Sequence, residues 1–407
     1  MQIDRRRFVF GSLAGVSAGP LSARSWRRWL GPAALDARAL VVVQLSGGND
    51  ALNTLVPAGD DRYRRARPKL GLPAAGLVPF ADGCGLHPEM NPLRPLVERG
   101  EVACVAGVGY PNPDRSHFRS MEIWQAARLD ETPGFSGWLG RAADALGVDG
   151  GAAPAIHVGS TEASFALASE RTIVPSLVDL GHAAVRVDPE LADAGARQRA
   201  LLDELARAAR EEPTPARIAA GARAAYAFAA RLAAVEVNNA GRDGYPDTGL
   251  GRKLRVVSRI LEAGFPTRIF AVELDGFDTH ANQPETHAAL LREMSGALAA
   301  FHDDLRRRGH GDRVVTFAFS EFGRRVAENS SAGTDHGAGG LVLLAGERVR
   351  GGLHGGPPDL ESLQDGDLAP RVDFRSVYAT LLDQWLGVDS EAILFGRFAP
   401  IPVLDAR

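Results

Sequence analysis

The chain has 407 residues, of which 45% are hydrophobic and 24% are charged, and its formal net charge is −4. This composition is typical of a globular protein, and the length allows one large domain or two smaller ones. Nucleic acid is not expected as a partner, because the net charge is negative and the basic residues form no long run. No apolar stretch is long enough to cross a bilayer, so no transmembrane span is predicted.

The N-terminal residues have the composition of an export signal. Arg5, Arg6 and Arg7 precede Phe8 and a short, weakly apolar stretch of glycine, alanine and serine. Such a pattern is typical of secretory signals, and an arginine pair followed after one residue by phenylalanine resembles the twin-arginine motif. Residues 1–38 are therefore predicted to be a twin-arginine signal and linker. The twin-arginine translocation machinery would then be a partner, and the protein would be periplasmic or secreted. An arginine-rich amphipathic start on a cytosolic protein is the alternative.

The chain has two cysteines, Cys84 and Cys104. In an oxidising compartment this pair is a candidate for one disulfide that closes a modest loop. Two cysteines are too few for a disulfide framework or for a metal cluster held by thiolates.

The mature chain is predicted to begin with a buried parallel strand. Residues 39–45 are a continuous apolar run that ends at a glycine-rich turn containing Asn49 and Asp50. An acidic residue just beyond the first strand is a common place for a site in a doubly wound sheet. The alternative is a simple turn, because glycine and aspartate are frequent turn residues.

A second core strand is predicted over residues 101–109 and a helix over residues 118–127, with a proline-rich loop between them. Ser116 lies where this loop meets the helix. A helix N-terminus is a favourable position for binding an anion. The alternative role of Ser116 is to cap the helix.

The composition changes sharply between residues 189 and 241, where alanine, arginine, leucine and glutamate dominate. The apolar periodicity predicts amphipathic helices, divided by Pro213 and Pro215. We interpret this segment as a helical insertion whose arginines form a solvated face.

The second half returns to alternating strands and helices. Helices are predicted over residues 250–263, 285–308 and 374–386, and strands over residues 268–274, 314–319 and 341–344. Residues 39–407 are therefore predicted to form a single α/β domain. Its fold class is a doubly wound, mostly parallel sheet sandwiched by helices, with the helical insertion added.

Ionisable residues stand at the ends of the predicted strands. They are Asp50, Asp278, His280, Glu321, Asp335 and His336. The carboxyl ends of parallel strands lie along one edge of a sheet, so these residues are expected to converge. Carboxylates and imidazoles without thiolates suit zinc, manganese, magnesium or calcium. The six residues are therefore predicted to hold divalent metal ions, expected to be two; ordinary turn and capping roles are the alternative.

Ser116 is the predicted nucleophile, activated by a metal ion, because the chain lacks the G-x-S-x-G motif of conventional serine hydrolases. Arg119 and Arg324 carry guanidinium groups that recognise phosphate or sulfate in a bidentate manner. Salt bridges near the cleft are their alternative role. Asn49 and His117, next to Asp50 and Ser116 in the sequence, are the other predicted substrate-binding residues.

Several motifs together resemble one bacterial family. They are Ser-Gly-Gly-Asn-Asp (46–50), Asp-Arg-Ser-His-Phe (114–118), Gly-Trp-Leu-Gly-Arg (137–141), Gly-Phe-Asp-Thr-His (276–280), Phe-Ser-Glu-Phe-Gly-Arg (319–324), Gly-Thr-Asp-His-Gly (333–337) and Asp-Phe-Arg-Ser-Val-Tyr (373–378). Their combination resembles the domain-of-unknown-function family 1501 over essentially the whole mature chain. Members are typically exported by the twin-arginine route. The family is placed in the alkaline phosphatase and sulfatase superfamily, which implies a doubly wound α/β fold and usually two metal ions.

The resemblance also implies roles for single residues. Asp50 resembles the superfamily's first aspartate, which touches metal, and Ser116 stands where its nucleophile is expected. The absence of cysteine around Ser116 gives no support for formylglycine chemistry.

Asp278 and His280 resemble the later ligands of one metal. One residue separates them where the superfamily usually leaves three, so Asp275 or His287 is an alternative ligand. The superfamily's Asp-His position corresponds either to Asp335-His336 or to the strand tip at Glu321.

The sequence thus predicts an exported, metal-dependent hydrolase that acts on a small anionic phosphate or sulfate ester. A non-catalytic protein on the same fold is the alternative, because a fold does not determine a function. Such a protein would act in secretion or cell-surface assembly, or would bind an anionic glycan.

Overall fold

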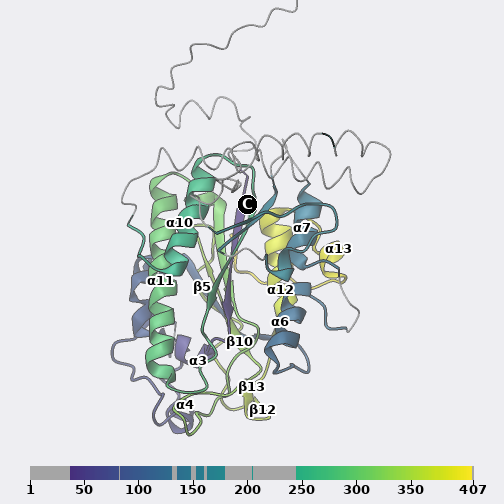
Figure 1. Ribbon diagram of the computed structural model, residues 1–407. Coiled ribbons are helices and arrows are strands. Elements are labelled where there is room, and N and C mark those ends of the chain that lie inside the picture. Colours follow the sequence, from purple (N-terminus) through teal and green to yellow (C-terminus); the bar gives the residue numbers. More distant parts are fainter. Residues whose placement is uncertain are drawn as a thin grey trace, which may run out of the picture.

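The computed structural model describes residues 37–81, 83–130, 135–147, 153–159, 163–178, 204 and 244–405 (Figure 1). The predicted signal and linker, apart from residues 37 and 38, and the predicted helical insertion, apart from residue 204, lie outside the described residues. Among the described residues, no helix has both the length and the apolar character needed to cross a membrane.

A nine-stranded sheet lies at the centre of the structure. Its strands follow the order β11 (Gly352–His354), β5 (Val102–Gly109), β10 (Gly340–Ala345), β9 (Val314–Phe319), β1 (Ala39–Ser46), β8 (Ile269–Asp275), β6 (Ala155–Val158) and β7 (Ser176–Leu177), and β14 (Val372–Asp373) pairs with β5. Strand β10 runs antiparallel to both of its neighbours, whereas the other pairings within this sheet are parallel. The predicted α/β class with a mostly parallel sheet is confirmed.

Strand β1 is apolar throughout because both of its faces are covered. Val41 and Val43 belong to one hydrophobic core, and Leu40 and Val42 belong to the core on the opposite face. A strand buried on both sides requires apolar residues at successive positions. The register pairs Gln44 with Phe319 of β9 and Ser46 with Asp275 of β8, so the carboxyl ends of the three strands lie side by side.

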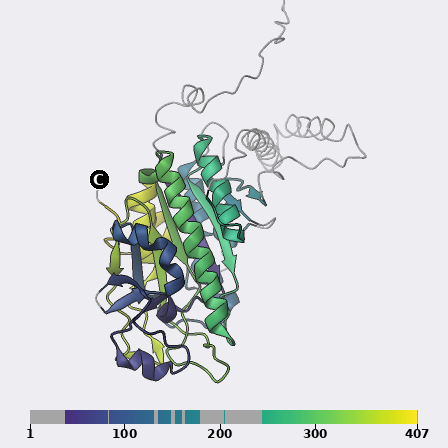
Figure 2. The same ribbon diagram turned by 90° about the vertical axis from the view of Figure 1, so that its left-hand side faces the viewer.

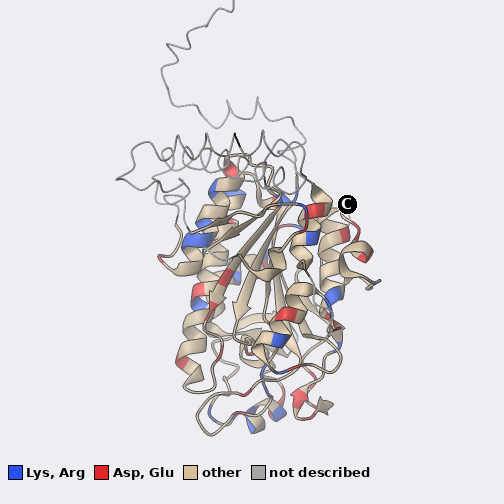
Figure 3. Cartoon of the chain, turned by 45° about the vertical axis from the view of Figure 1, so that its right-hand side comes forward, with Lys and Arg blue, Asp and Glu red and all other residues tan. Residues whose placement is uncertain are grey.

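Helices cover both faces of the sheet (Figures 1 and 2). One face packs against α10 (Gly249–Glu262), α11 (Gln283–Arg307), the 3₁₀ helix η1 (Pro88–Leu93) and α5 (Arg94–Glu98). The other packs against α6 (His117–Ala126), α7 (Trp138–Leu146), α12 (Phe374–Ala379), the π-helix η4 (Thr380–Leu386) and α13 (Ser390–Leu394). The central strands carry few charged residues, as expected for a sheet between two apolar layers (Figure 3).

Short elements surround the carboxyl ends of the central strands, at the lower end of Figure 1. They are α3 (Ala51–Thr54), α4 (Asp61–Ala66), the three-stranded sheet of β2 (Leu55–Val56), β4 (Cys84–Leu86) and β3 (Val78–Ala81), and the pair β12 (Leu363–Gln364) and β13 (Asp367–Leu368). Strands this short show no readable periodicity in the sequence. The 3₁₀ turns η2 (Phe165–Leu167) and η3 (Gly311–Arg313) complete the described elements.

Cys84 and Cys104, the candidate disulfide pair, are both buried and are not bonded to each other.

Candidate functional site

The loops that follow β1, β8 and β9 touch one another, and glycine permits the contact. Gly47 has φ +118°, and a Cβ atom there would lie 2.4 Å from the backbone nitrogen of Asp278. A Cβ atom on Gly333 would lie 2.2 Å from the carbonyl carbon of His280. A side chain at either position would separate the loops, so these glycines bring the ionisable residues within reach of one another.

The buried side chain of Arg324 forms hydrogen bonds that connect the same three loops. Its side chain is buried, and its nitrogens donate to the carbonyls of Gly48, Phe277 and Thr334 at 2.7–3.0 Å and to that of Gly47. It also donates to Asp278 Oδ1 at 2.8 Å. Arg324 was predicted to bind substrate, but every guanidinium nitrogen donates to the protein, so its contacts are those of a residue that holds the loops together.

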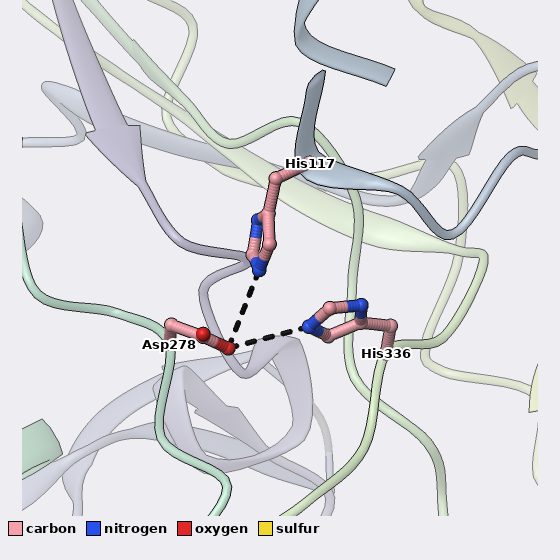
Figure 4. Close-up of side chains that lie close together, drawn as sticks. All are labelled: His117, Asp278 and His336. Carbon is pink, nitrogen blue, oxygen red and sulfur yellow. Dashed lines mark hydrogen bonds and ion pairs between the residues drawn. The ribbon is translucent and has the colours of Figure 1, made fainter. Parts of the chain in front are cut away.

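Three imidazoles converge on Asp278. Its Oδ1 atom lies 3.4 Å from His117 Nε2, 3.1 Å from His280 Nε2 and 3.2 Å from His336 Nε2. Figure 4 shows His117 and His336 pointing at the Asp278 carboxylate from two different segments of the chain. His117 is the first residue of α6, and the other two histidines lie in the loops after β8 and β9. Of the six predicted metal ligands, Asp278, His280 and His336 are brought together, and His117 joins them.

The second nitrogen of each ring is engaged by an oxygen acceptor. His117 Nδ1 contacts Glu321 Oε1 at 2.8 Å, His280 Nδ1 contacts Asp335 Oδ1 at 3.2 Å, and His336 Nδ1 contacts the Arg115 carbonyl at 2.7 Å. A carbonyl accepts but does not donate, so His336 Nδ1 carries the hydrogen and the Nε2 atom of the neutral ring presents a lone pair. Glu321 and Asp335, predicted as ligands, thus lie behind the ligating atoms, in the arrangement that orients metal-binding histidines.

The converging atoms fit a divalent cation. The ligand atoms of His117, Asp278 and His336 lie within 4.8 Å of one another. A tetrahedral site with bonds of about 2.0–2.1 Å has edges of about 3.3 Å, close to the three distances from Asp278. Among the described groups, the buried His117 Nε2 atom finds no hydrogen-bond partner. His280 Nε2 and His336 Nε2 are 2.9 Å apart, a separation that requires a proton or a cation between two lone pairs.

The electrostatics also favour a cation. Burial acts to raise the pKa of Asp278, but the hydrogen bond and the charge of Arg324 bring it down to about 2. Burial likewise acts to raise the pKa of Glu321, and the hydrogen bond from His117 is the main influence that brings it below its usual value. That contact raises the pKa of His117, whereas burial lowers the pKa of His336. Both carboxyls are therefore ionised at neutral pH, which leaves negative charge beside the ring nitrogens.

Asp50 is not brought into this group. Its carboxylate is 1% exposed, and Arg67 donates to both of its oxygens, at 2.6 and 3.0 Å. Gln283 Nε2 and the Leu52 backbone nitrogen donate to it as well, at 2.5 and 3.1 Å. Burial acts to raise the pKa of Asp50, but the charge of Arg67 lowers it. These contacts give Asp50 the environment of a buried ion pair.

The substrate-binding candidate Asn49 lies in the same buried region. It is 3% exposed, and its Oδ1 atom contacts His287 Nε2 at 2.9 Å and accepts from Thr54 Oγ1 at 3.0 Å. Asn49 is therefore buried among protein groups and does not contact His117, Asp278 or His336. His287, an alternative ligand in the sequence analysis, shares this position.

Ser116 and Arg119 lie on the exposed side of α6. Ser116 precedes the helix, and its side chain makes no capping hydrogen bond. It stands between Arg115, whose carbonyl contacts His336, and His117. Arg119 pairs with Glu122 at 2.8 Å and donates to the carbonyls of residues 129 and 130. Ser116 thus adjoins the histidine cluster, whereas the Arg119 guanidinium is engaged along its own helix and the turn beyond it.

The sequence analysis missed two residues that shape the site. Arg67 neutralises Asp50, and Gln283 links Asp50 to Thr334, whose Oγ1 donates to Gln283 Oε1 at 2.6 Å. Neither residue lies in a recognisable motif. Arg67 follows the short helix α4 and Gln283 begins the long helix α11, and only tertiary packing brings the two beside Asp50.

Similarity to solved structures is distant. A protein of the alkaline phosphatase superfamily from Vibrio parahaemolyticus is 12% identical, with a TM-score of 0.40 over 89% of this chain and 69% of that chain. The PsFucS1 sulfatase from Pseudoalteromonas sp. is 12% identical, with a TM-score of 0.41 over 94% and 75%. The C-terminal periplasmic domain of EcEptC from Escherichia coli, in complex with Zn, is 10% identical, with a TM-score of 0.36 over 77% and 74%. At these values the similarities carry no argument about activity.

A comparison with curated proteins found no significant match. A family profile, by contrast, covers most of the sequence. Residues 37–399 match the family described as "Protein of unknown function (DUF1501)", and the chain therefore belongs to this family.

Proposed function

We propose that this protein is a metal-dependent enzyme that cleaves phosphate or sulfate esters. The observation that carries the proposal is the convergence of three histidine Nε2 atoms on Asp278 Oδ1, with each Nδ1 atom held by an oxygen. His117, Asp278 and His336 would hold the ion, and His280 would be a further ligand. A divalent ion bound there supplies Lewis-acid polarisation of a phosphoryl or sulfuryl oxygen.

The donor set favours zinc, because neutral imidazole nitrogens outnumber the carboxylate. With neutral rings and one ligating carboxylate, a divalent ion and its direct ligands together keep a net positive charge, which favours contact with the oxygen of an anionic ester. The described residues gather one such group of ligand atoms. We therefore propose one ion at this site rather than the two expected from the sequence.

Ser116 is the proposed nucleophile. Its position between Arg115 and His117 supports this role, because the Arg115 carbonyl contacts His336 and His117 is itself part of the histidine cluster. The exposed hydroxyl at the start of α6 is also open to substrate. Replacement Ser116→Ala is expected to abolish turnover without loss of bound metal.

Export is also part of the proposal, with residues 1–38 as a twin-arginine signal. The arginines at the start of the chain support it. Cell fractionation of the double replacement Arg5→Lys and Arg6→Lys tests the route, and an unchanged periplasmic or secreted fraction would contradict it.

Metal analysis of protein purified without chelator tests the central claim. About one ion per chain is expected for the wild type. Asp278→Asn and His117→Ala are expected to lose the ion together with activity on a panel of phosphate and sulfate esters. The matched control is Asp275→Asn, an exposed carboxylate at the end of β8 that lies outside the cluster. Metal-free wild-type protein, or a full metal content in Asp278→Asn, would refute the metal centre.

A further inference from the structure

A cleft of about 530 Å³ opens beside the metal ligands. It includes His117, Asp278 and Glu321, and it extends from the end of β1 along α6 to η2. Its volume falls within the range of about 300–1,000 Å³ that is usual for small-molecule sites. An ester with its anionic group at the histidine cluster would therefore place its alcohol part in this cleft.

The walls of the cleft are apolar. Phe118 and Met121 lie three residues apart on one face of α6, and Phe165 comes from η2. Phe118 is 92% exposed, which is unusual for a large aromatic side chain. An exposed aromatic ring at the rim of a cleft offers a flat surface for the apolar face of a ligand ring.

The inner end of the cleft carries a row of uncharged polar groups. Gln125 Nε2 donates to Gln44 Oε1 at 2.8 Å, and Gln44 Nε2 donates to Ser46 Oγ at 3.1 Å. Both glutamines are buried, at 8% and 9% exposure. Within the described part of the chain, the row leaves the Gln125 amide oxygen free to accept and the Ser46 hydroxyl free to donate. A hydroxyl group on the ligand can pair with either, because it both donates and accepts.

Charge excludes a second anion from this cleft. Lysine and arginine are absent from the described residues that line it. Glu122, which also lines it, adds a carboxylate that forms an ion pair with Arg119. An anionic substituent there would lose its hydration without gaining a cationic partner.

We propose that the cleft selects esters whose alcohol part is an uncharged ring bearing a hydroxyl group. This inference rests on the proposed function for the placement of the anionic end. Phe118 and Phe165 would stack on the ring, and Gln125 and Ser46 would bind its hydroxyl. Phosphate and sulfate esters of the same alcohol should share this preference, because the cleft contacts only the alcohol part.

Two matched esters test the selection on metal-loaded protein. They are 4-(hydroxymethyl)phenyl phosphate and 4-carboxyphenyl phosphate, measured with the corresponding sulfates. The carboxyl ester is expected to have a kcat/KM at least about tenfold lower. Phe118→Ala should raise KM for the hydroxymethyl ester about fivefold with little change in kcat. Phe135→Ala is the control, because Phe135 is 86% exposed but does not line the cleft.

The outcomes separate this inference from the proposed function. Equal kcat/KM values for the two esters, or equal effects of Phe118→Ala and Phe135→Ala, would overturn the inference while leaving the enzyme in place. If no ester is cleaved, the proposed function fails, and binding of 4-(hydroxymethyl)phenol decides the inference alone. Binding that Phe118→Ala weakens supports it, and the absence of binding overturns it.

Discussion

At the scale of single residues, the contacts divide the acidic side chains into two roles. The carboxylate of Asp278 faces the Nε2 atoms, whereas Glu321 and Asp335 contact Nδ1 atoms from behind. A group that contacts Nδ1 fixes the orientation and tautomer of the ring without touching the ion. All three were predicted as metal ligands, because the local sequence does not distinguish a carboxylate that binds the ion from one that orients a histidine.

Glu321→Gln tests this division. The amide has the same shape as the carboxylate but no charge. His117 Nδ1 therefore loses its ionised hydrogen-bond acceptor, while the His117 ring itself remains available to bind the metal. Metal affinity is expected to fall about 10–100-fold without complete loss of binding. Competition titration against a chelator of known affinity measures the change. Glu122→Gln is the control, because Glu122 lines the cleft but pairs with Arg119 rather than with a histidine. Unchanged affinity in Glu321→Gln would contradict the assigned role.

The Asp50–Arg67 pair is expected to be a stability determinant. Arg67→Met leaves the fully buried Asp50 carboxylate without its cation, which should destabilise the fold by about 3–5 kcal/mol. Chemical denaturation measures the free energy of unfolding. Arg65→Met, an exposed position on α4, should change it by about 0.5 kcal/mol or less. If Asp50→Asn added to Arg67→Met restores no stability, the unpaired charge is not the cause.

At the scale of elements, the site depends on how closely three loops approach. Strand ends supply the ligands, but glycine decides whether the loops can touch. Gly47 combines a positive φ with a neighbour at 2.4 Å, whereas Gly76 has φ +93° and no atom within 4 Å. The two positions therefore separate backbone strain from steric contact.

Gly47→Ala is expected to displace the loop that carries Asp278. Gly76→Ala introduces a similar backbone strain of about 1–3 kcal/mol but no clash. Both variants should therefore lose stability in thermal unfolding, whereas only Gly47→Ala should lose bound metal. Equal metal content in both variants would show that the loop approach is not required.

The long elements were predictable because their burial imposes a pattern on the sequence. Strand β1 was predicted over residues 39–45, and helix α11 over residues 285–308 against an observed Gln283–Arg307. The predicted helix over residues 374–386 is split, since its second half, Thr380–Leu386, is a π-helix. The small sheet around β4 was missed, because two- to four-residue strands take their structure from tertiary packing.

At the scale of the whole molecule, buried histidines make stability depend on pH. Burial lowers the pKa of each of three histidines to about 4; they are His157, His287 and His302. The folded state then binds fewer protons than the unfolded state between about pH 6.5 and pH 4. The contribution of these histidines to the free energy of unfolding is therefore fully present above pH 6.5, and it is lost as the pH decreases toward 4.

His302→Gln should flatten this decline. His302 Nε2 contacts Thr316 Oγ1 at 3.0 Å, a contact that an uncharged glutamine side chain can retain. A pKa shift from 6.5 to about 4 corresponds to about 3 kcal/mol in the free energy of unfolding. Between pH 6.5 and pH 4, the stability of the variant should therefore fall by up to that much less than the stability of the wild type. The measurement is the free energy of unfolding across this range. A slope in His302→Gln equal to that of the wild type would contradict this role of His302.

The sequence by itself determined the order of the strands and helices along the chain, and the segments whose ends carry ionisable residues. Continuous apolar runs encode burial on both faces of a sheet, and a strand must end where polar residues and glycine follow. These features are local, so they are readable without a structure. They led to Asp278, His280 and His336 from the sequence alone.

Only the tertiary structure decided which ionisable residues meet. Asp50 and Asp278 both follow a central strand, yet Arg67 and Gln283 enclose the first, and three imidazoles surround the second. The partners lie up to 233 residues apart along the chain in the first case. A carboxylate becomes half of a buried ion pair or a metal ligand according to the groups that packing brings within about 3 Å, and no local pattern encodes those groups.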